Sequence, residues 1–131
     1  MTKPQFLAVD DVLYIHRREI ERAGGDPGVR DFGLVESSAA AAHASFEGEW
    51  LHEDLFAMAG AYIAAFVQNH PFVDGNKRTG TAAALTFLFL NGYELTEEHT
   101  GELADFILQF VTNEIERDEV VAYLRSHAHE R

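Results

Sequence analysis

The chain has 131 residues, of which 47% are hydrophobic and 24% are charged, a balance typical of a soluble globular domain with an ordinary core. Its formal net charge of −12 argues against direct binding to nucleic acid or to an anionic membrane surface, because both carry negative charge themselves. The absence of cysteine excludes disulfides and thiolate metal sites.

The first ten residues lack the pattern of a signal peptide. No apolar run approaches the roughly 20 residues that span a bilayer. We therefore expect a cytoplasmic protein without a membrane partner. No internal repeat or linker interrupts the chain, so residues 1–131 are expected to form one domain.

Hydrophobic periodicity and capping residues predict six helices. In chain order they cover residues 10–24, 33–44, 54–69, 76–90, 103–111 and 118–124. We expect the first to be capped by Asp10 or Asp11, the third by Asp54 and the last by Asp118. Residues 45–53 lack a helical period, which favours a loop or short hairpin, and this is the only β element that the sequence indicates.

The fourth predicted helix is the most hydrophobic. From Ala82 to Leu90 its only polar residue is Thr86, so we expect it to be buried all round at the centre of the domain. His16 and His43 are expected to be partly buried side chains with satisfied hydrogen bonds. The fold class is thus all-α, with amphipathic helices around one central hydrophobic helix.

Most of the candidate chemistry lies in the nine residues from His70, which read His-Pro-Phe-Val-Asp-Gly-Asn-Lys-Arg. Between residues 31 and 116 the chain has fourteen acidic residues, and Lys77 and Arg78 are its only Lys or Arg. An acidic protein has thus placed its only mid-chain positive charge beside a Gly-Asn turn, which indicates a bound anion.

The start of the fourth helix supports a phosphate site. The first N–H groups of a helix have no partner within it, and the helix dipole adds partial positive charge there. Gly75 allows another group to approach the backbone closely. Gly75, Asn76, Lys77 and Arg78 are therefore the candidate phosphate-binding residues.

Two further side chains complete the candidate site. Asp74 is the only carboxylate in the turn, and one carboxylate together with phosphate oxygens and waters is the usual way that Mg²⁺ is held beside a polyphosphate. His70 can accept a proton from an attacking hydroxyl at neutral pH. Together these residues predict group transfer from a nucleotide.

The nine residues closely resemble the Fic/Doc motif, His-x-Phe-x-Asp/Glu-Gly/Ala-Asn-x-Arg. Residues 24–31, 46–50 and 87–93 also look like the Doc (death-on-curing) branch, so the resemblance covers nearly the whole chain. It implies a Fic/Doc-type helical bundle with a short β-hairpin flap. It also implies that His70 deprotonates the target hydroxyl, that Asp74 holds Mg²⁺ and that residues 75–78 bind the phosphates of ATP. The flap that would dock a target segment as an added strand comprises Phe46, Glu47, Gly48, Glu49, Trp50 and Leu51.

Within this family, Fic proteins mostly transfer AMP to a protein hydroxyl. Doc toxins instead phosphorylate a threonine of elongation factor Tu, which stops translation, and are held inactive by a Phd-type antitoxin. The AMP-transferring pattern reads Gly-Asn-Gly-Arg-x-x-Arg, whereas this chain has Lys77 and Thr81 at the third and last positions. Both departures match the Doc branch, in which the γ-phosphate lies toward the target.

The resemblance therefore implies a toxin that transfers the γ-phosphate of ATP to a Ser or Thr hydroxyl of a protein, with elongation factor Tu as the expected target. The alternatives are an AMP or other nucleotidyl transferase acting on another protein, and a non-catalytic partner-binding module. Residues 112–116 have the spacing of the inhibitory Ser/Thr-x-x-x-Glu motif of Fic enzymes but are followed by Arg117. We therefore expect inhibition by a separate, Phd-type antitoxin chain.

Overall fold

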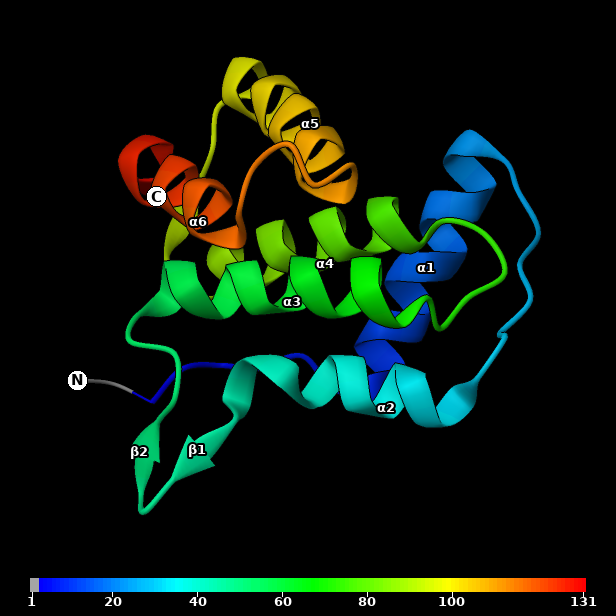
Figure 1. Ribbon diagram of the computed structural model, residues 1–131, viewed down its shortest axis with the longest axis horizontal. Coiled ribbons are helices and arrows are strands. Elements are labelled where there is room, and N and C mark those ends of the chain that lie inside the picture. The colour runs from blue at the N-terminus through cyan, green and yellow to red at the C-terminus, as the bar shows by residue number, and fades with distance from the viewer. Residues whose placement is uncertain (1–2) are drawn as a thin grey trace.

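The computed structural model describes residues 3–131 and has the expected all-α architecture (Figure 1). The first two residues of the domain expected over 1–131 lie outside the described part. The helices are α1 (Val9–Ala23), α2 (Phe32–Ala40), the 3₁₀ helix η1 (Ala41–His43), α3 (Leu55–Asn69), α4 (Asn76–Leu90), α5 (Glu97–Val111) and α6 (Arg117–His127). Within residues 3–131, none of these helices has the length and apolarity needed to cross a bilayer.

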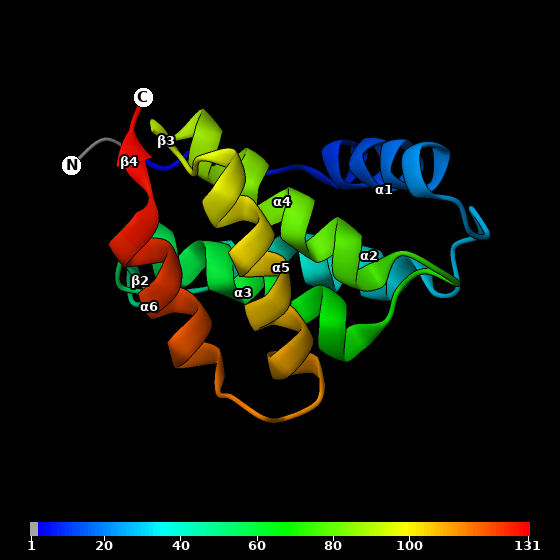
Figure 2. The same cartoon turned by 90° about the horizontal axis from the view of Figure 1, so that it is seen from above.

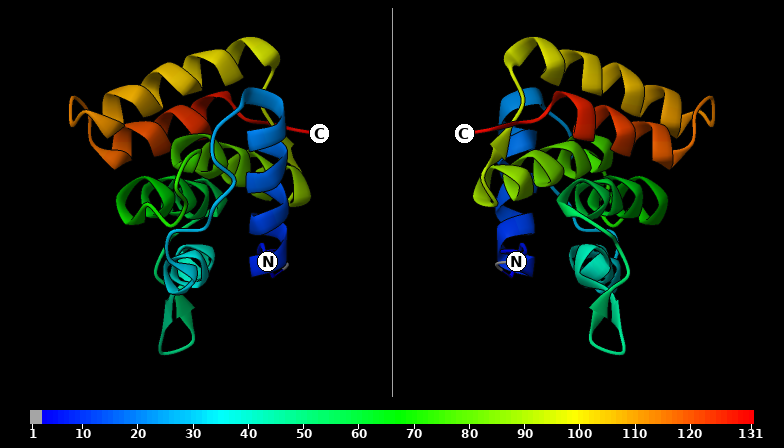
Figure 3. Two further views of the ribbon diagram at one scale, coloured as in Figure 1. Left: turned by 90° about the vertical axis from the view of Figure 1, so that its right-hand side faces the viewer. Right: turned by 90° about the vertical axis from the view of Figure 1, so that its left-hand side faces the viewer.

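The antiparallel pair α3 and α4 forms the middle of the molecule. Helices α5 and α6 cover one side of the pair and α2 lies on the other, while α1 crosses near the end where α3 turns into α4 (Figures 1 and 3). Glycine allows close packing in two places. A Cβ on Gly80 of α4 would lie 3.1 Å from Cβ of Phe66 in α3, and one on Gly60 would lie 2.5 Å from Cγ2 of Val121 in α6.

The core lies between these layers. Its largest fully buried side chains are Tyr62, Phe66, Phe72, Phe87, Met58, Ile63, Leu88, Leu103, Ile107 and Leu124. Helix α4 is central, as predicted, but it is not buried all round. Phe89 and Leu90 are 46% and 41% exposed, and Thr81, Ala82 and Leu85 are half-buried. The prediction was wrong here because part of the α4 surface between α1 and α5 is left open.

Capping residues explain where most helices begin. The Asp54 carboxylate accepts the N–H of Ala57 at 2.8 Å, which confirms the predicted cap of α3. The caps predicted for α1 and α6 were wrong, because these helices begin after Ala8 and Glu116. The acidic residues of α1 and α6 instead lie in the first helical turn, where the helix dipole also favours negative charge.

The predicted hairpin is present as β1 (Ser45–Phe46) and β2 (Glu49–Trp50), joined by Glu47 and Gly48, both with positive φ. A second antiparallel pair, β3 (Tyr93–Glu94) with β4 (His129–Glu130), corrects the expectation of a single β element. Strands of two residues carry no periodicity, and these two lie far apart in sequence. His43 is exposed and has no hydrogen-bond partner among residues 3–131, contrary to prediction, because the end of η1 faces solvent.

Candidate functional site

The nine-residue motif forms the turn between α3 and α4 and the start of α4. His70 ends α3 in the left-handed conformation, with φ 48° and ψ 57°, and its N–H donates to the Phe66 carbonyl at 3.3 Å. Histidine is among the residues that adopt this conformation more often than most. Pro71 follows and turns the chain away from α3. The His70 side chain is consequently exposed at the helix end.

Arg30, from the α1–α2 connection, holds this helix end in place. Its Nε donates to the His70 carbonyl at 2.6 Å and Nη2 donates to the Asn69 carbonyl at 2.8 Å. Its backbone N–H also donates to the Pro71 carbonyl at 2.8 Å. Sequence reasoning missed this role. Residues 24–31 carried the family resemblance, but no spacing rule predicts which carbonyls an arginine caps forty residues away.

The same connection pairs with the turn like a short strand. Val29 lies opposite Phe72 in an antiparallel bridge, and the Val73 N–H donates to the Gly28 carbonyl at 3.0 Å. The backbone N–H of Asp26 donates to Oδ2 of Asp74 at 2.8 Å. The Asp74 carboxylate is therefore held by one oxygen, while Oδ1 has no hydrogen-bond partner within residues 3–131.

His16 of α1 contacts the turn between α3 and α4. It is only 3% exposed, and its Nε2 lies 2.9 Å from the Asp74 carbonyl oxygen. Because a carbonyl can only accept, Nε2 carries the hydrogen. Burial lowers the pKa of His16, the hydrogen bond to Asp74 opposes this, and the positive charge of Arg78 lowers the pKa further. The hydrogen bond to Asp74 confirms the predicted satisfied hydrogen bond of His16, but the side chain is buried more completely than predicted.

The Asn76 side chain closes the turn. It is buried, its Oδ1 accepts the Phe72 N–H at 2.9 Å, and its Nδ2 donates to the Phe72 carbonyl at 2.9 Å. Nδ2 also lies 3.4 Å from Nδ1 of His70, which is long for a hydrogen bond. The Asn76 side chain, which was predicted to bind phosphate, is therefore already hydrogen-bonded within the turn. The backbone N–H of Asn76 is the group that remains available to an anion.

The N-terminus of α4 has the features of an anion site. Its N-cap is Gly75, at φ 81° and without a capping side chain. Within the described chain, the backbone N–H groups of Asn76, Lys77 and Arg78 have no hydrogen-bond acceptor. Three uncapped N–H groups at the positive end of a helix dipole match the chemistry of a phosphate group.

The two cations of the motif have different surroundings. The Arg78 guanidinium donates to the carbonyls of Glu19 and Gly24, at 3.3 and 3.0 Å, and thereby caps the end of α1. Lys77 is half-buried, and no carboxylate or carbonyl of residues 3–131 pairs with its ammonium group. In a chain with a net charge of −12, this is a cation that the described protein leaves unneutralised.

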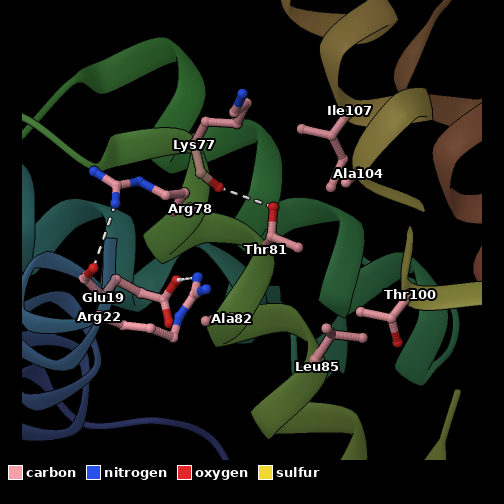
Figure 4. A pocket seen from close by; sticks show the side chains of 10 residues that line it. All are labelled: Glu19, Arg22, Lys77, Arg78, Thr81, Ala82, Leu85, Thr100, Ala104 and Ile107. Atoms are coloured by element: carbon pink, nitrogen blue, oxygen red, sulfur yellow. Dashed lines mark hydrogen bonds and ion pairs between the residues drawn. The ribbon is translucent and has the colours of Figure 1, made fainter. Parts of the chain in front are cut away.

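The predicted site residues line one hollow of about 340 Å³, together with Val73. They are His70, Asp74, Gly75, Asn76, Lys77 and Arg78. A second hollow of about 450 Å³ lies between α1, α4 and α5 and shares Lys77 and Arg78 with the first (Figure 4). Among the described residues, no group of three or more His, Asp or Glu side chains is placed to hold a metal.

The structure does not bring the flap to this site. The β1–β2 hairpin precedes α3, whereas His70 follows it, so the two lie at opposite ends of that helix (Figures 1 and 2). Fifteen residues of helix separate them by about 22 Å. Phe46 and Leu51 are 66% and 62% exposed, while Trp50 packs edge-on against Phe6.

The sequence is also similar to those of known proteins. The sequence profile of the Fic/DOC family matches residues 6–88, so the chain belongs to the Fic/Doc family. It is 34% identical over 121 residues to "Toxin Doc" from Mycolicibacterium smegmatis (strain ATCC 700084 / mc(2)155), an alignment that covers 88% of this chain and 93% of the relative. It is also 34% identical over 119 residues to "Protein kinase doc" from Escherichia phage P1, covering 91% and 92%.

Proposed function

We propose that this chain is a Doc-like toxin that transfers the γ-phosphate of ATP to a Ser or Thr hydroxyl of a target protein. The observation that carries the proposal is Lys77, a half-buried cation without a partner among residues 3–131. It lies at the uncapped N-terminus of α4 and in the same hollow as His70. A polyphosphate would neutralise it. The names of the two relatives, a toxin and a protein kinase, support the same reading.

In the proposed reaction, His70 acts as general base. Its Nε2 has no hydrogen-bond partner within residues 3–131, so it is free to take the proton of the target hydroxyl. The hydroxyl oxygen forms a bond to the γ-phosphorus as the bond from that phosphorus to the bridging oxygen breaks, which leaves ADP. The N–H groups of α4 and the ammonium of Lys77 stabilise the charge on the phosphoryl oxygens.

Asp74 is the proposed ligand of Mg²⁺. The bond from the Asp26 N–H orients the carboxylate and leaves Oδ1 free for a cation, which fits binding of Mg²⁺ by one carboxylate with phosphate oxygens and waters. When bound, Mg²⁺ would neutralise part of the phosphate charge. Gly75 and the backbone of Asn76 would contact phosphate oxygens, while Arg78 would act mainly by shaping the end of α1 against them.

The toxin proposal implies two protein partners. We propose elongation factor Tu as the target, in the cytoplasm, and a separate Phd-type antitoxin chain as the inhibitor. Residues 112–116 lie in the turn between α5 and α6, so this segment forms no inhibitory helix of its own. Docking of the target strand on the β1–β2 hairpin stays a prediction, and the length of α3 requires the docked segment to reach about 22 Å to His70.

Intact-mass spectrometry tests the proposal directly. Purified elongation factor Tu is incubated with this protein, ATP and Mg²⁺, and we expect a phosphate-sized gain in mass. The His70→Ala variant should give no gain. His43→Ala is the matched control, because it removes an exposed histidine away from the turn, and it should retain the gain.

Other results would change the proposal in defined ways. An AMP-sized gain would assign the chain to AMP transfer despite Lys77 and Thr81. A phosphate gain that survives His70→Ala would contradict the role of His70. Absence of any gain on elongation factor Tu, with a phosphate gain on another protein of a whole lysate, would replace the target and keep the chemistry. Absence of both would favour the non-catalytic module.

A further inference from the structure

One face of α1 packs against the turn that carries the candidate site. The helix crosses the end of the molecule where α3 turns into α4 (Figure 1). Its residues His16 and Ile20, one helical turn apart, are both buried. A Cβ on Gly75 would lie 3.2 Å from Cδ1 of Ile20 and 3.6 Å from Cδ2 of His16, so α1 lies directly against the N-cap of α4. The site is therefore in contact with a helix that is far from the motif in sequence.

His16 makes two contacts with this turn that differ in kind. Its ring stacks face to face on the Phe72 ring, and its Nε2–H donates to the Asp74 carbonyl at 2.9 Å. A purely apolar ring could provide the stacking, whereas the hydrogen bond requires a donor at the edge of the ring. Histidine suits this position because it provides both.

The hydrogen bond sets the direction of a second polar group. The Asp74 carbonyl and the Gly75 N–H belong to one planar trans peptide group, in which C=O and N–H point in opposite directions. Because the carbonyl points toward His16, the Gly75 N–H points away from α1. Gly75 lines the hollow that also contains His70, and its N–H has no hydrogen-bond acceptor within residues 3–131. This N–H is therefore available to a bound anion.

Gly75 leaves this peptide group free to turn. Its φ of 81° is one that glycine adopts readily, and glycine adopts negative φ about equally well. A half-turn of the Asp74–Gly75 peptide plane would bring φ of Gly75 to a negative value and would place the Asp74 carbonyl where the Gly75 N–H now lies. The partial negative charge of that oxygen would then face the hollow that Lys77 lines, and it would repel an anion.

We propose that His16 is a positioning residue for the anion site, because it holds the Asp74–Gly75 peptide group in the orientation that donates to an anion. The glycine allows two orientations, and the bond from Nε2 selects one of them. Stacking on Phe72 keeps the imidazole in place, so that its N–H stays directed at the carbonyl. The inference rests on the proposed function, because the anion concerned is the polyphosphate of that reaction.

Calorimetry with inorganic tripolyphosphate and Mg²⁺ measures the anion site separately from phosphate transfer. His16→Phe retains an aromatic ring and loses the donor, and we expect its affinity to fall by about tenfold or more. His16→Gln has an N–H donor at a similar distance from the backbone, and it should recover most of the affinity. Val12→Ala is the matched control, because it removes methyl groups from a similarly buried position one turn earlier on α1, and it should bind like the wild type.

The outcomes separate the positioning role from the proposed function. Equal affinity of His16→Phe and the wild type would overturn the positioning role, as would an equal loss in Val12→Ala. A His16→Gln affinity as low as that of His16→Phe would contradict the role of the hydrogen bond. If the wild type does not bind tripolyphosphate, both proposals fail. If it binds with the expected differences between variants but transfers no phosphate to any protein, the proposed function fails and the positioning role is supported.

A crystal structure of His16→Phe provides a readout that a loss of stability alone would not produce. We expect the Asp74 carbonyl to be turned away from α1 and φ of Gly75 to be negative. The Val12→Ala structure should retain φ near 81° at Gly75. A His16→Phe structure in which the carbonyl still points toward α1 would show that the bond from His16 does not select the orientation.

Discussion

His16 and Phe72 stack face to face, with ring centroids 3.7 Å apart and ring planes inclined by 5°. The same imidazole donates a hydrogen bond to the Asp74 carbonyl. One buried side chain of α1 therefore fixes both the apolar anchor of the turn and the backbone of the proposed metal ligand. The position of Asp74 depends on α1, on the α1–α2 connection and on α4 together.

Stability should depend on the protonation of His16. Burial lowers the pKa of His16 below its ordinary value of 6.5, so the unfolded chain takes up this proton at a higher pH than the folded one. The stability that neutral His16 provides is complete above pH 6.5 and declines as the pH falls below 6.5 toward the lowered pKa. Urea unfolding of the wild type and of His16→Phe, at several pH values, measures this.

The phenylalanine variant keeps an aromatic ring against Phe72 but loses the donor and the titration. At neutral pH we expect His16→Phe to be less stable by about 1 kcal/mol. The difference between wild type and variant should shrink as the pH falls, because only the wild type must lose a proton to fold. A difference that stays constant with pH would contradict the role of His16.

Arg30 should act as a positioning residue for His70. Arg30→Ala removes the charged donors from the Asn69 and His70 carbonyls, and we expect a loss of about 1.5–3 kcal/mol in the free energy of unfolding. The turnover number should fall while the KM for ATP changes little, because the phosphate site on α4 is retained. Arg30→Lys should recover part of the free energy of unfolding and part of the turnover number, since an ammonium group also interacts favourably with a helix C-terminus. Arg17→Ala, on the exposed side of α1, is the control, and an equal effect there would contradict the prediction.

Asn76 should matter to stability as much as to activity. Asn76→Ala would leave the N–H and C=O of buried Phe72 without partners, at a cost of about 1–3 kcal/mol. Thermal unfolding without nucleotide measures this directly. Asn91→Ala is a useful comparison, because Asn91 also bonds backbone groups but at a half-buried position. It should cost less.

Asp74→Asn should separate metal binding from folding. The amide oxygen can still accept the Asp26 N–H, so we expect the free energy of unfolding to change by less than about 1 kcal/mol. The loss of charge should raise the Mg²⁺ concentration required for half-maximal phosphate transfer. A metal titration of the turnover rate measures this, and an unchanged curve would show that Asp74 is not the ligand.

Two glycine-to-alanine substitutions should have opposite effects on stability, because one glycine is packed between α3 and α6 and the other faces open space in α5. Gly60→Ala would place Cβ 2.5 Å from Val121 Cγ2 and should destabilise the fold by roughly 1–3 kcal/mol. Val121→Ala should relieve most of that loss in the double variant. Gly101→Ala in α5 meets nothing within 4 Å and should stabilise by up to about 1 kcal/mol through helix propensity. Similar unfolding temperatures for the two single variants would contradict this.

Local sequence signals were sufficient for much of this fold. The Asp54 cap predicted the start of α3, and the glycine-containing turn before Asn76 predicted the start of α4. Both helices lie where they were predicted. The β1–β2 hairpin was also predicted, because its residues lack a helical period. His70 and Asp74 line one hollow, since both lie in one short turn.

Other features depend on contacts that a single sequence does not reveal. Arg78 and Lys77 are adjacent cations, yet Arg78 caps α1 while Lys77 has no partner in the described part of the chain. The packing of α1 against α4 causes this difference. Complete burial of α4 was predicted from composition, but exposure depends on which neighbours surround it. The distance from the hairpin to His70 follows from the direction of α3, which no local pattern specifies.

The contacts that build the turn span long stretches of sequence. Arg30 and His70 are 40 residues apart, Asp26 and Asp74 are 48 apart, and His16 and Asp74 are 58 apart. The nine motif residues therefore do not determine their own geometry, because that geometry depends on contacts with the whole first half of the chain. If cells are selected for survival while expressing this protein, inactivating mutations should accumulate in residues 16–31 as well as in residues 70–78.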